Sequence, residues 1–302
     1  MTYAPPPLDM SDPKIIQQLV ETIDADFEDA SVKMFDDGFR KHLGASVIGK
    51  ACSREIWYGF RWARASDFST KTASHGQKLR LFNRGHREES PIIALLKLAG
   101  FTFEPRPIGP DGFPTQHTMG WFANGHFGGS GDEICYLPAK FNFPHKVLLE
   151  VKTSNTTEFR KLKKDRLRLH RPQHWAQVCA YGYGMKIDYV LYVSIDKNTD
   201  EVYFEFLKID HAMGKDMISK AEMIVETKIA PPRIAQSGAA IACQMCNFKP
   251  MCHYNEPLEK NCRSCKNATA VADGKWHCDH WNQLIPLDAL IHGCPEHKEI
   301  GT

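Results

Sequence analysis

The sequence has no strong excess of either charge, no internal repeat and no apolar run long enough to cross a bilayer. Its 302 residues include 38 Lys and Arg and 36 Asp and Glu, so the net charge is only +2. Any affinity for nucleic acid must therefore come from local basic patches. The longest apolar stretch, residues 92–101, is interrupted by Lys97, and no membrane partner is expected. The beginning, MTYAPPPLDMSDPK, lacks the apolar core of a signal peptide, so a cytoplasmic protein is expected.

Cysteine, by contrast, is frequent and clustered. In a reducing compartment, clustered cysteines indicate metal binding rather than the disulfide framework of small secreted chains. Cys52 stands alone near the beginning and a C-x2-C-x5-C group stands near the end, and together they are called the first cysteine set: Cys52, Cys243, Cys246 and Cys252. The second set opens with a C-x2-C knuckle typical of zinc ribbons: Cys262, Cys265, Cys278 and Cys294. Nearby histidines are alternative ligands of the second set: His277, His280, His292 and His297. The two remaining cysteines, Cys135 and Cys179, are expected to be buried core thiols.

The apolar patterns along the chain predict an α/β fold with a mixed sheet flanked by helices. Helices are expected at residues 13–30, 52–65, 76–99 and 172–183, and a further helix ends near residue 227. Strands are expected at residues 101–105, 116–122, 128–137 and 146–152, and a hairpin at 188–195 and 201–209. Ser11 is a candidate cap of the first helix. The predicted domains are a disordered leader (1–12), a main domain (13–255) and a small Cys-rich module (256–302).

Charged side chains interrupt the buried strand predicted at residues 146–152. Because side chains alternate along a strand, the run KVLLEVK places Glu150 and Lys152 on one face and Val151 on the other. Asp132 lies upstream, directly after a glycine-rich segment. A charged pair on a buried strand is costly unless it is paired or functional, so this pair favours a functional site. Carboxylates and a backbone carbonyl, such as that of Val151, are ligands that Mg²⁺ accepts.

Taken in order, one Cys, a carboxylate, an E-x-K triplet and three Cys resemble the iron–sulfur branch of the RecB-like PD-(D/E)XK nucleases. This branch includes the CRISPR-associated RecB-like exonucleases and the AddB nuclease domain. Two further elements match its pattern: Gly85-His86 upstream, and Gln177-x3-Tyr181 on one face of a predicted helix. The resemblance covers about residues 45–255 and leaves the zinc-ribbon-like C-terminal module as an addition.

The resemblance implies a DNA nuclease that uses Mg²⁺ or Mn²⁺, most simply an exonuclease that favours single-stranded ends. The metal ligands that it implies are His86, Asp132, Glu150 and the Val151 carbonyl. The catalytic residues that it implies are Asp132, Glu150, Lys152, Gln177 and Tyr181, the last two positioning the substrate. It also implies a [4Fe–4S] cluster on the first cysteine set, whereas spacing alone suits zinc as well. The second set is predicted to bind Zn²⁺.

A basic run follows the E-x-K triplet. Between residues 160 and 171, one acid stands against seven basic residues: Arg160, Lys161, Lys163, Lys164, Arg166, Arg168 and Arg171. Such runs are often solvated surfaces, but the position of this one favours phosphate binding. Phe159, His174 and Trp175 are candidates for stacking on unpaired bases.

Three alternative functions stay open at this point. They are an endonuclease of the same fold in recombination or CRISPR adaptation, a non-catalytic DNA-binding scaffold, and a redox regulator. The complete set of acids and lysine argues against the scaffold, which has no need of them. DNA is the expected partner, and a separate helicase, recombinase or CRISPR adaptation protein is a candidate one. The resemblance is compatible with a bacterial, archaeal or phage-infected cell.

Overall fold

The computed structural model describes residues 11–36, 38–64 and 74–301. The chain divides into two compact units, of which the first contains residues 1–38 and 66–87 and the second contains residues 39–65 and 88–302. The predicted leader lies almost wholly outside the described residues. Within the described part, no helix combines the length and the apolar character that a membrane span requires.

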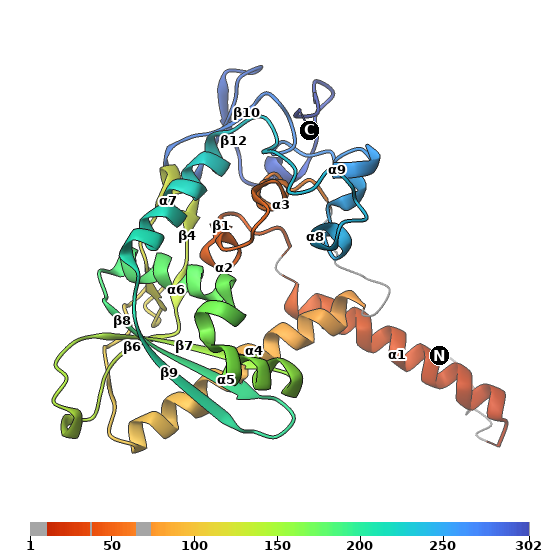
Figure 1. Ribbon diagram of the computed structural model, residues 1–302. Helices are drawn as coiled ribbons and strands as arrows, with labels where there is room; N and C mark the ends of the chain where they lie inside the picture. The colour runs from red at the N-terminus through yellow and green to blue at the C-terminus, as the bar shows by residue number, and fades with distance from the viewer. Residues whose placement is uncertain (1–10, 37, 65–73, 302) are drawn as a thin grey trace. The chain divides into compact units, whose positions relative to one another are not determined.

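The first unit consists of α1 (Pro13–Phe35) and the beginning of α4 (His75–Leu98) (Figure 1). A proline at the first helical position fixes where α1 begins, since its φ suits a helix and its missing N–H is not needed there. The cap is therefore the preceding residue, Asp12, whose side chain accepts a hydrogen bond from the Lys14 N–H at 2.9 Å. The prediction that Ser11 is the cap is wrong by one residue.

The second unit is built around a five-stranded mixed sheet in the order β2–β6–β7–β8–β9 (Figure 1). Its strands are β2 (Thr102–Phe103), β6 (Glu133–Tyr136), β7 (Val147–Ser154), β8 (Tyr189–Asp196) and β9 (Val202–Lys208). β7 and β8 run parallel, and the other neighbours are antiparallel. The predicted α/β class is confirmed, as are the buried strand and the hairpin that follows it.

β7 is the central strand, and helices cover both of its faces. Val147, Leu149 and Val151 pack on one face, against α4. Leu148 points to the other face, which α6 (Pro172–Met185) covers. A strand buried on both sides needs a nearly continuous apolar run, and this one is interrupted only by its E-x-K triplet.

Shorter elements surround the sheet. The other helices are α2 (Ala45–Ile48), α3 (Ser53–Phe60), α5 (Thr156–His170), α7 (His211–Glu226), α8 (Ile241–Gln244) and α9 (Lys249–Tyr254). Two small sheets pair β1 (Leu43–Gly44) with β4 (Phe127–Gly128) and β3 (His117–Thr118) with β5 (Ser130–Gly131). Helix α5 was not among the predicted elements, and the strands expected at 116–122 and 128–137 are shorter than predicted.

The C-terminal segment carries a three-stranded sheet within the same compact unit. Its strands are β10 (Ala268–Ala270), β11 (Trp276–Cys278) and β12 (Gln283–Ile285). The predicted domain boundary between residues 255 and 256 stays a prediction.

Two buried arginines fix this segment to the end of α3. The fully buried guanidinium of Arg263 lies 4.5 Å from the ring centre of Phe60, 4.3 Å from Trp62 and 4.8 Å from Trp276. The guanidinium of Arg61 lies 5.0 Å from the same Trp276 ring. Burial, and then the nearby charge of Arg61, lower the pKa of Arg263 well below its usual range. The rings take the place of a counter-ion, because the face of an aromatic ring attracts a cation.

Candidate active site and cysteine sites

Strand β7 and the bend before β6 bring three of the predicted residues together. Asp132 lies in that bend, and its Oδ2 accepts a hydrogen bond from the backbone N–H of Val151 at 2.6 Å. Glu150 and Lys152 share the other face of β7, and Lys152 Nζ donates to Glu150 Oε1. The alternation expected along the strand is therefore observed, with the charged pair on one face and Val151 in the apolar layer of the other.

Burial determines the charge state of this pair. The Glu150 side chain is 1% exposed and that of Lys152 is 28% exposed. Burial raises the pKa of Glu150, and the charge of Asp132 adds to this while Lys152 opposes it. Burial also disfavours the charged form of Lys152, but Glu150 and Asp132 outweigh it and raise the pKa of Lys152. Lys152 is therefore positively charged and lies beside two acids, Glu150 and Asp132. These acids repel each other, and binding of a further cation would reduce that repulsion.

Helix α6 presents a polar stripe to the same face. Gln177 Nε2 donates to Glu150 Oε1 at 3.1 Å and to the Tyr181 hydroxyl at 2.9 Å. Gln177 and Tyr181 are both buried. The structure therefore brings Gln177 to the carboxylate of Glu150 and Tyr181 to the amide of Gln177. Their action on a substrate stays a prediction.

A histidine–tyrosine pair extends this stripe, and sequence analysis did not connect it to the site. His174 lies on α6 one turn before Gln177, and its Nδ1 lies 2.8 Å from the Tyr192 hydroxyl. Tyr192 is buried and faces Glu150 in the register of β7 and β8. Burial, and then the charge of Lys152, lower the pKa of His174 to about 3, so its imidazole is neutral. A hydroxyl that donates to Nδ1 leaves the ring proton on Nε2.

Helix α4 adds an acid that sequence analysis also missed. Burial raises the pKa of Glu150 most, and the charge of Glu89 on α4 adds a smaller contribution in the same direction. The predicted ligand His86 lies one turn earlier on α4, in the part that belongs to the first unit. The role of His86 as a metal ligand stays a prediction. The only signal for Glu89 in the sequence was its place on the same helix.

The acids have the chemistry of a site for a hard divalent cation. Lys152 contacts one oxygen of Glu150, and the other, Oε2, is buried without a hydrogen-bond partner among the described residues. Carboxylate oxygens are the ligands that Mg²⁺ and Mn²⁺ prefer. As placed, no three His, Cys, Asp or Glu side chains in the described ranges stand close enough together to hold a metal ion. The side chains therefore have the oxygen donors that a divalent cation needs, but they are not arranged as a complete coordination shell.

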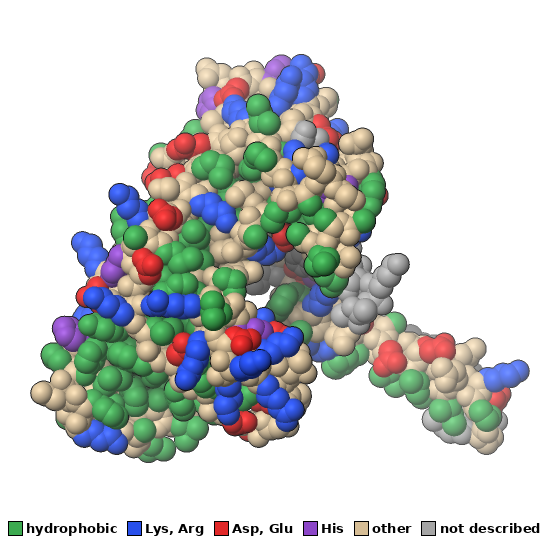
Figure 2. All heavy atoms as spheres, in the orientation of Figure 1, with side chains coloured by type: hydrophobic (Ala, Val, Ile, Leu, Met, Phe, Trp, Pro, Cys, Tyr) green, Lys and Arg blue, Asp and Glu red, His purple; other side chains and the backbone are tan. Residues whose placement is uncertain are grey.

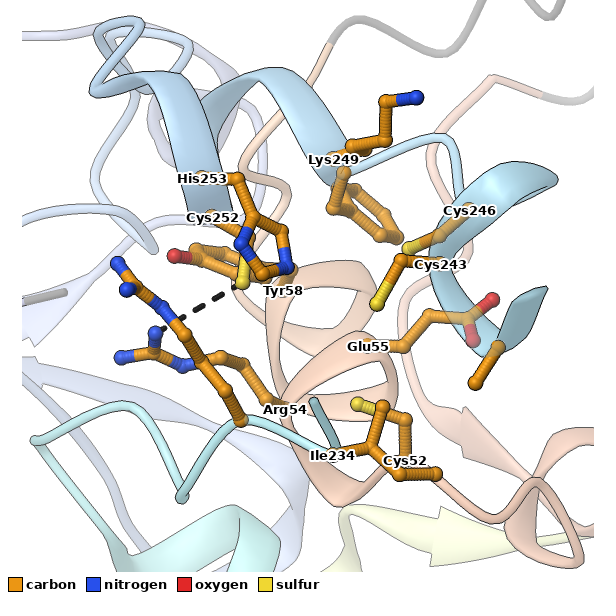
Figure 3. Close-up of a pocket in the computed structure, with 13 residues that line it drawn as sticks. Cys52, Arg54, Glu55, Tyr58, Ile234, Cys243, Cys246, Lys249, Cys252 and His253 are labelled. Carbon is orange, nitrogen blue, oxygen red and sulfur yellow. Dashed lines mark hydrogen bonds between the residues drawn. The ribbon is translucent and has the colours of Figure 1, made fainter. Parts of the chain in front are cut away.

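The first cysteine set lines a single cavity (Figure 3). Cys52 caps the beginning of α3, Cys243 lies on α8, Cys246 follows it and Cys252 lies on α9. All four are free thiols. Three separate segments of the chain thus bring to one cavity the four residues that the resemblance implied.

Two buried polar groups line the same cavity. Arg54 Nη1 lies 3.8 Å from Cys252 Sγ (Figure 3), and Arg54 Nε has no hydrogen-bond partner among the described residues. The buried hydroxyl of Tyr58 likewise has none there. Buried donors are normally satisfied. The pair therefore fits a group with more acceptors than four thiolates, such as a cluster whose sulfides also accept hydrogen bonds.

The second cysteine set lines another cavity. Its thiols are Cys262, Cys265, Cys278 and Cys294, and His280 and His297 also line it. Burial, and then the charges of the other three cysteines, raise the pKa of Cys262 to about 11. No described residue that lines this cavity has a buried side-chain N or O atom without a partner. Four thiols that line one cavity without additional donors have the donor chemistry of a Zn²⁺ site, and the ion would neutralise their thiolate charge.

Burial decides several smaller predictions. Phe159 is 0% exposed and Trp175 is 5% exposed, with the Arg168 guanidinium 4.4 Å from the Trp175 ring centre. The prediction that these two rings stack on bases is wrong, because both are part of the apolar core. Cys135 and Cys179 are confirmed as core thiols, since burial raises the pKa of each to about 12.

The basic run lies on α5, and Figure 2 shows Lys and Arg side chains gathered over this helix. Most of these cations already contact neighbouring groups. The contacts are Lys161 and Arg171 to Glu158, Lys163 to Glu201, Arg166 to the Tyr203 hydroxyl, and Arg168 to the Lys208 carbonyl. Exposed pairs of this kind contribute little to stability, so phosphates can replace them. The role of the run in DNA binding stays a prediction.

No family model matches the chain, and no curated protein matches its sequence. Some solved structures resemble its fold at low similarity. The alkaline exonuclease LHK-Exo from Laribacter hongkongensis is 14% identical, with a TM-score of 0.39 over 61% of this chain and 86% of that one. Its complex with dAMP gives 16% and 0.41 over the same shares. SSO0001 is 14% identical, with a TM-score of 0.41 over 76% of this chain and 96% of that one. Similarity at this level assigns no function to the chain.

Proposed function

We propose that the chain is a metal-dependent DNA nuclease, most simply an exonuclease acting on single-stranded ends. The observation that carries this proposal is the buried Glu150–Lys152 pair, with Asp132 beside it and Gln177 bonded to the same carboxylate. Buried acids with perturbed pKa values reduce stability and are typical of catalytic centres. Hard oxygen ligands next to a charged lysine suit the hydrolysis of a phosphodiester.

The proposed metal ligands are Asp132, Glu150, the Val151 carbonyl and His86, with Glu89 as a further candidate. When bound, Mg²⁺ or Mn²⁺ supplies an activated water and neutralises charge that develops on the phosphate. Glu150 Oε2 is buried without a hydrogen-bond partner in the described part of the chain, which supports this assignment.

The other residues of the site prepare the reaction in this proposal. Lys152, held in its charged form by Glu150, orients the attacking water or stabilises the transition state. Gln177, whose amide is also bonded to the Tyr181 hydroxyl, fixes the carboxylate of Glu150, and both residues position the substrate. His174, with its ring set by Tyr192, donates from Nε2 to a phosphate oxygen.

Removing the Tyr192 hydroxyl should slow DNA cleavage about three- to tenfold, because a hydrogen bond worth about 1 kcal/mol no longer fixes the imidazole of His174. The test is kcat and KM of Tyr192→Phe on labelled single-stranded DNA. Tyr189→Phe is the matched control, since that ring packs on the other face of the same sheet. An equal loss in both variants would contradict a specific role for Tyr192.

The proposed cofactors of the cysteine sites are a [4Fe–4S] cluster on the first set and Zn²⁺ on the second, both with structural roles. Protein purified without oxygen should contain about four iron atoms and one zinc atom per chain. Cys243→Ser should lose the iron and keep the zinc, and Cys278→Ser should do the reverse. Elemental analysis with a sulfide assay checks this, and zinc at both sites would contradict the cluster.

The basic run should make DNA binding depend on salt. Replacing Arg160 and Lys164 with Ala should reduce the slope of log Kobs against log salt by about 0.7 for each phosphate of single-stranded DNA that the protein no longer neutralises. Fluorescence anisotropy in an inactive background measures the slope. Lys215→Ala, an exposed lysine on α7, is the control and should leave the slope unchanged. An unchanged slope in the double variant would mean that the basic run does not bind DNA phosphates and is only a solvated surface.

The mode of cleavage is tested with linear and covalently closed circular single-stranded DNA in Mg²⁺ or Mn²⁺, beside the Lys152→Ala variant. Digestion of the linear DNA alone, lost in the variant, is the expected result. Cutting of the circle would make the protein an endonuclease. Failure to cut either DNA, by protein that retains its metals, would favour a DNA-binding scaffold. A helicase, recombinase or CRISPR adaptation protein as a further partner stays a prediction.

A further inference from the structure

An exposed apolar stripe runs along α1 and has no part in the proposed nuclease site. Apolar residues recur at intervals of four and three along this helix: Ile16, Val20, Ile23, Phe27, Ala30 and Met34. The large ones become more exposed along the helix, from 39% at Ile16 to 76% at Met34. Figure 2 shows apolar and acidic side chains along this helix. An apolar stripe of this length on an exposed helix indicates a partner surface.

We infer that α1 pairs in parallel with α1 of a second copy of this chain. Two consecutive intervals add up to seven residues, which is the repeat of a left-handed coiled coil, and the exposed large apolar residues of α1 fall only on this repeat, as in the narrow seam of a coiled coil. Val20, Phe27 and Met34 then occupy the a positions, and Ile16, Ile23 and Ala30 occupy the d positions. Each layer sets a residue against its own copy, so a single chain supplies both halves of the interface.

The charges beside the stripe select the parallel orientation. Asp24 and Asp26 occupy the e and g positions. In a parallel pair, Asp24 lies opposite Leu19 of the second copy and Asp26 lies opposite Ser31 of it, so no like charges meet. In an antiparallel pair with the same apolar layers, Asp24 faces Asp24 of the second copy and Asp26 faces Asp26 of the second copy, near the middle of the helix. Opposed carboxylates repel, so the parallel arrangement is favoured.

The structure also makes α1 a well-defined helix for this purpose. Asp12 caps its beginning, and α4 supports its second half. Arg80 of α4 contacts Glu28 at 3.2 Å and Ser31 Oγ at 2.6 Å, and its guanidinium lies 5.0 Å from the ring centre of Phe27. Phe27 nevertheless remains 61% exposed, so these contacts leave the stripe open to a second helix.

Sedimentation equilibrium on the full-length protein tests the inference. The wild type is expected to have the mass of two chains. Ile23→Asp, which places a charge in an apolar layer, should have the mass of one chain. Ala25→Asp adds the same charge at an exposed position outside the stripe and should keep the mass of two chains. A wild type with the mass of one chain, or equal dissociation of both variants, would overturn the inference.

Orientation is tested by neutralising the two aspartates. Asp24→Asn with Asp26→Asn should leave the dimer dissociation constant unchanged within about twofold for a parallel pair, because no like-charge contact is relieved. Tightening beyond about tenfold would indicate the antiparallel arrangement and overturn the parallel one. Ile23→Asp should retain DNA cleavage per chain, so failure of the dimer and failure of the proposed nuclease are measured separately.

Discussion

Lys152→Ala should reduce DNA cleavage at saturating Mg²⁺ by about 10²–10⁴-fold, the usual contribution of a positioned acid–base or charge-stabilising group. The Lys152 ammonium contacts the buried carboxylate of Glu150. The fold should persist, because burial favours protonation of Glu150 once its partner is gone. Single-turnover cleavage of labelled linear DNA measures the effect.

Two further variants separate the role of Lys152 from general charge. Lys146→Ala removes an exposed lysine just before the same strand, 2.9 Å from Glu104, and should cleave at the wild-type rate. Lys152→Arg keeps a positive charge but resists deprotonation, so partial activity would indicate charge stabilisation and none would indicate proton transfer. Full activity in Lys152→Ala would remove Lys152 from the mechanism.

Arg263→Ala should reduce the free energy of unfolding by about 2–4 kcal/mol, because it leaves a cavity between three rings and removes a hydrogen bond. Arg263 Nη1 donates to the Lys41 carbonyl at 3.1 Å, so the side chain joins the C-terminal segment to the chain before α3. The loss corresponds to a decrease in Tm of roughly 4–16 °C for a domain of this size. Thermal unfolding followed by circular dichroism measures it.

The controls for this prediction vary volume and exposure. Arg263→Met keeps most of the apolar volume without a buried charge, and its loss should be smaller. Arg64→Ala removes an exposed arginine near the same helix and should change Tm little. An unchanged Tm in Arg263→Ala would mean that the cost of burying the guanidinium equals the stabilisation from its contacts. The aromatic cage formed by Phe60, Trp62 and Trp276 around Arg263 would then not stabilise the attachment of the C-terminal segment.

The parts of the fold that sequence analysis predicted are those set by local pattern. The run around Glu150 identified the central strand because a strand that is buried on both faces requires a nearly continuous series of apolar residues, which is visible in the sequence. Helix α5 was missed because its charges outnumber its apolar residues, and because Arg166 interrupts it with a φ of 67°. The cap of α1 was misplaced because Ser11 and Asp12 are both good caps, and only the proline that follows decides between them.

Spacing predicted the pairs of site residues that are close in the chain, and only the family resemblance joined these pairs with Asp132. Glu150 and Lys152 lie on one strand, and Gln177 and Tyr181 lie on one helical face, so spacing alone grouped each pair. Tyr192 reaches the site only through the parallel register of β7 and β8, which no local pattern specifies. The cage around Arg263 likewise depends on contacts across about two hundred residues of sequence.

Cleavage of linear single-stranded DNA across a titration of Mg²⁺ or Mn²⁺, starting from protein that chelator has freed of Mg²⁺ and Mn²⁺ only, tests the central claim most directly. We predict no cleavage in chelator and a rate that rises with metal to a plateau, while the metals of the two cysteine sites stay bound throughout. Cleavage that is unchanged in chelator, or no cleavage at any metal concentration by folded protein, would contradict a metal-dependent nuclease centred on Glu150 and Lys152.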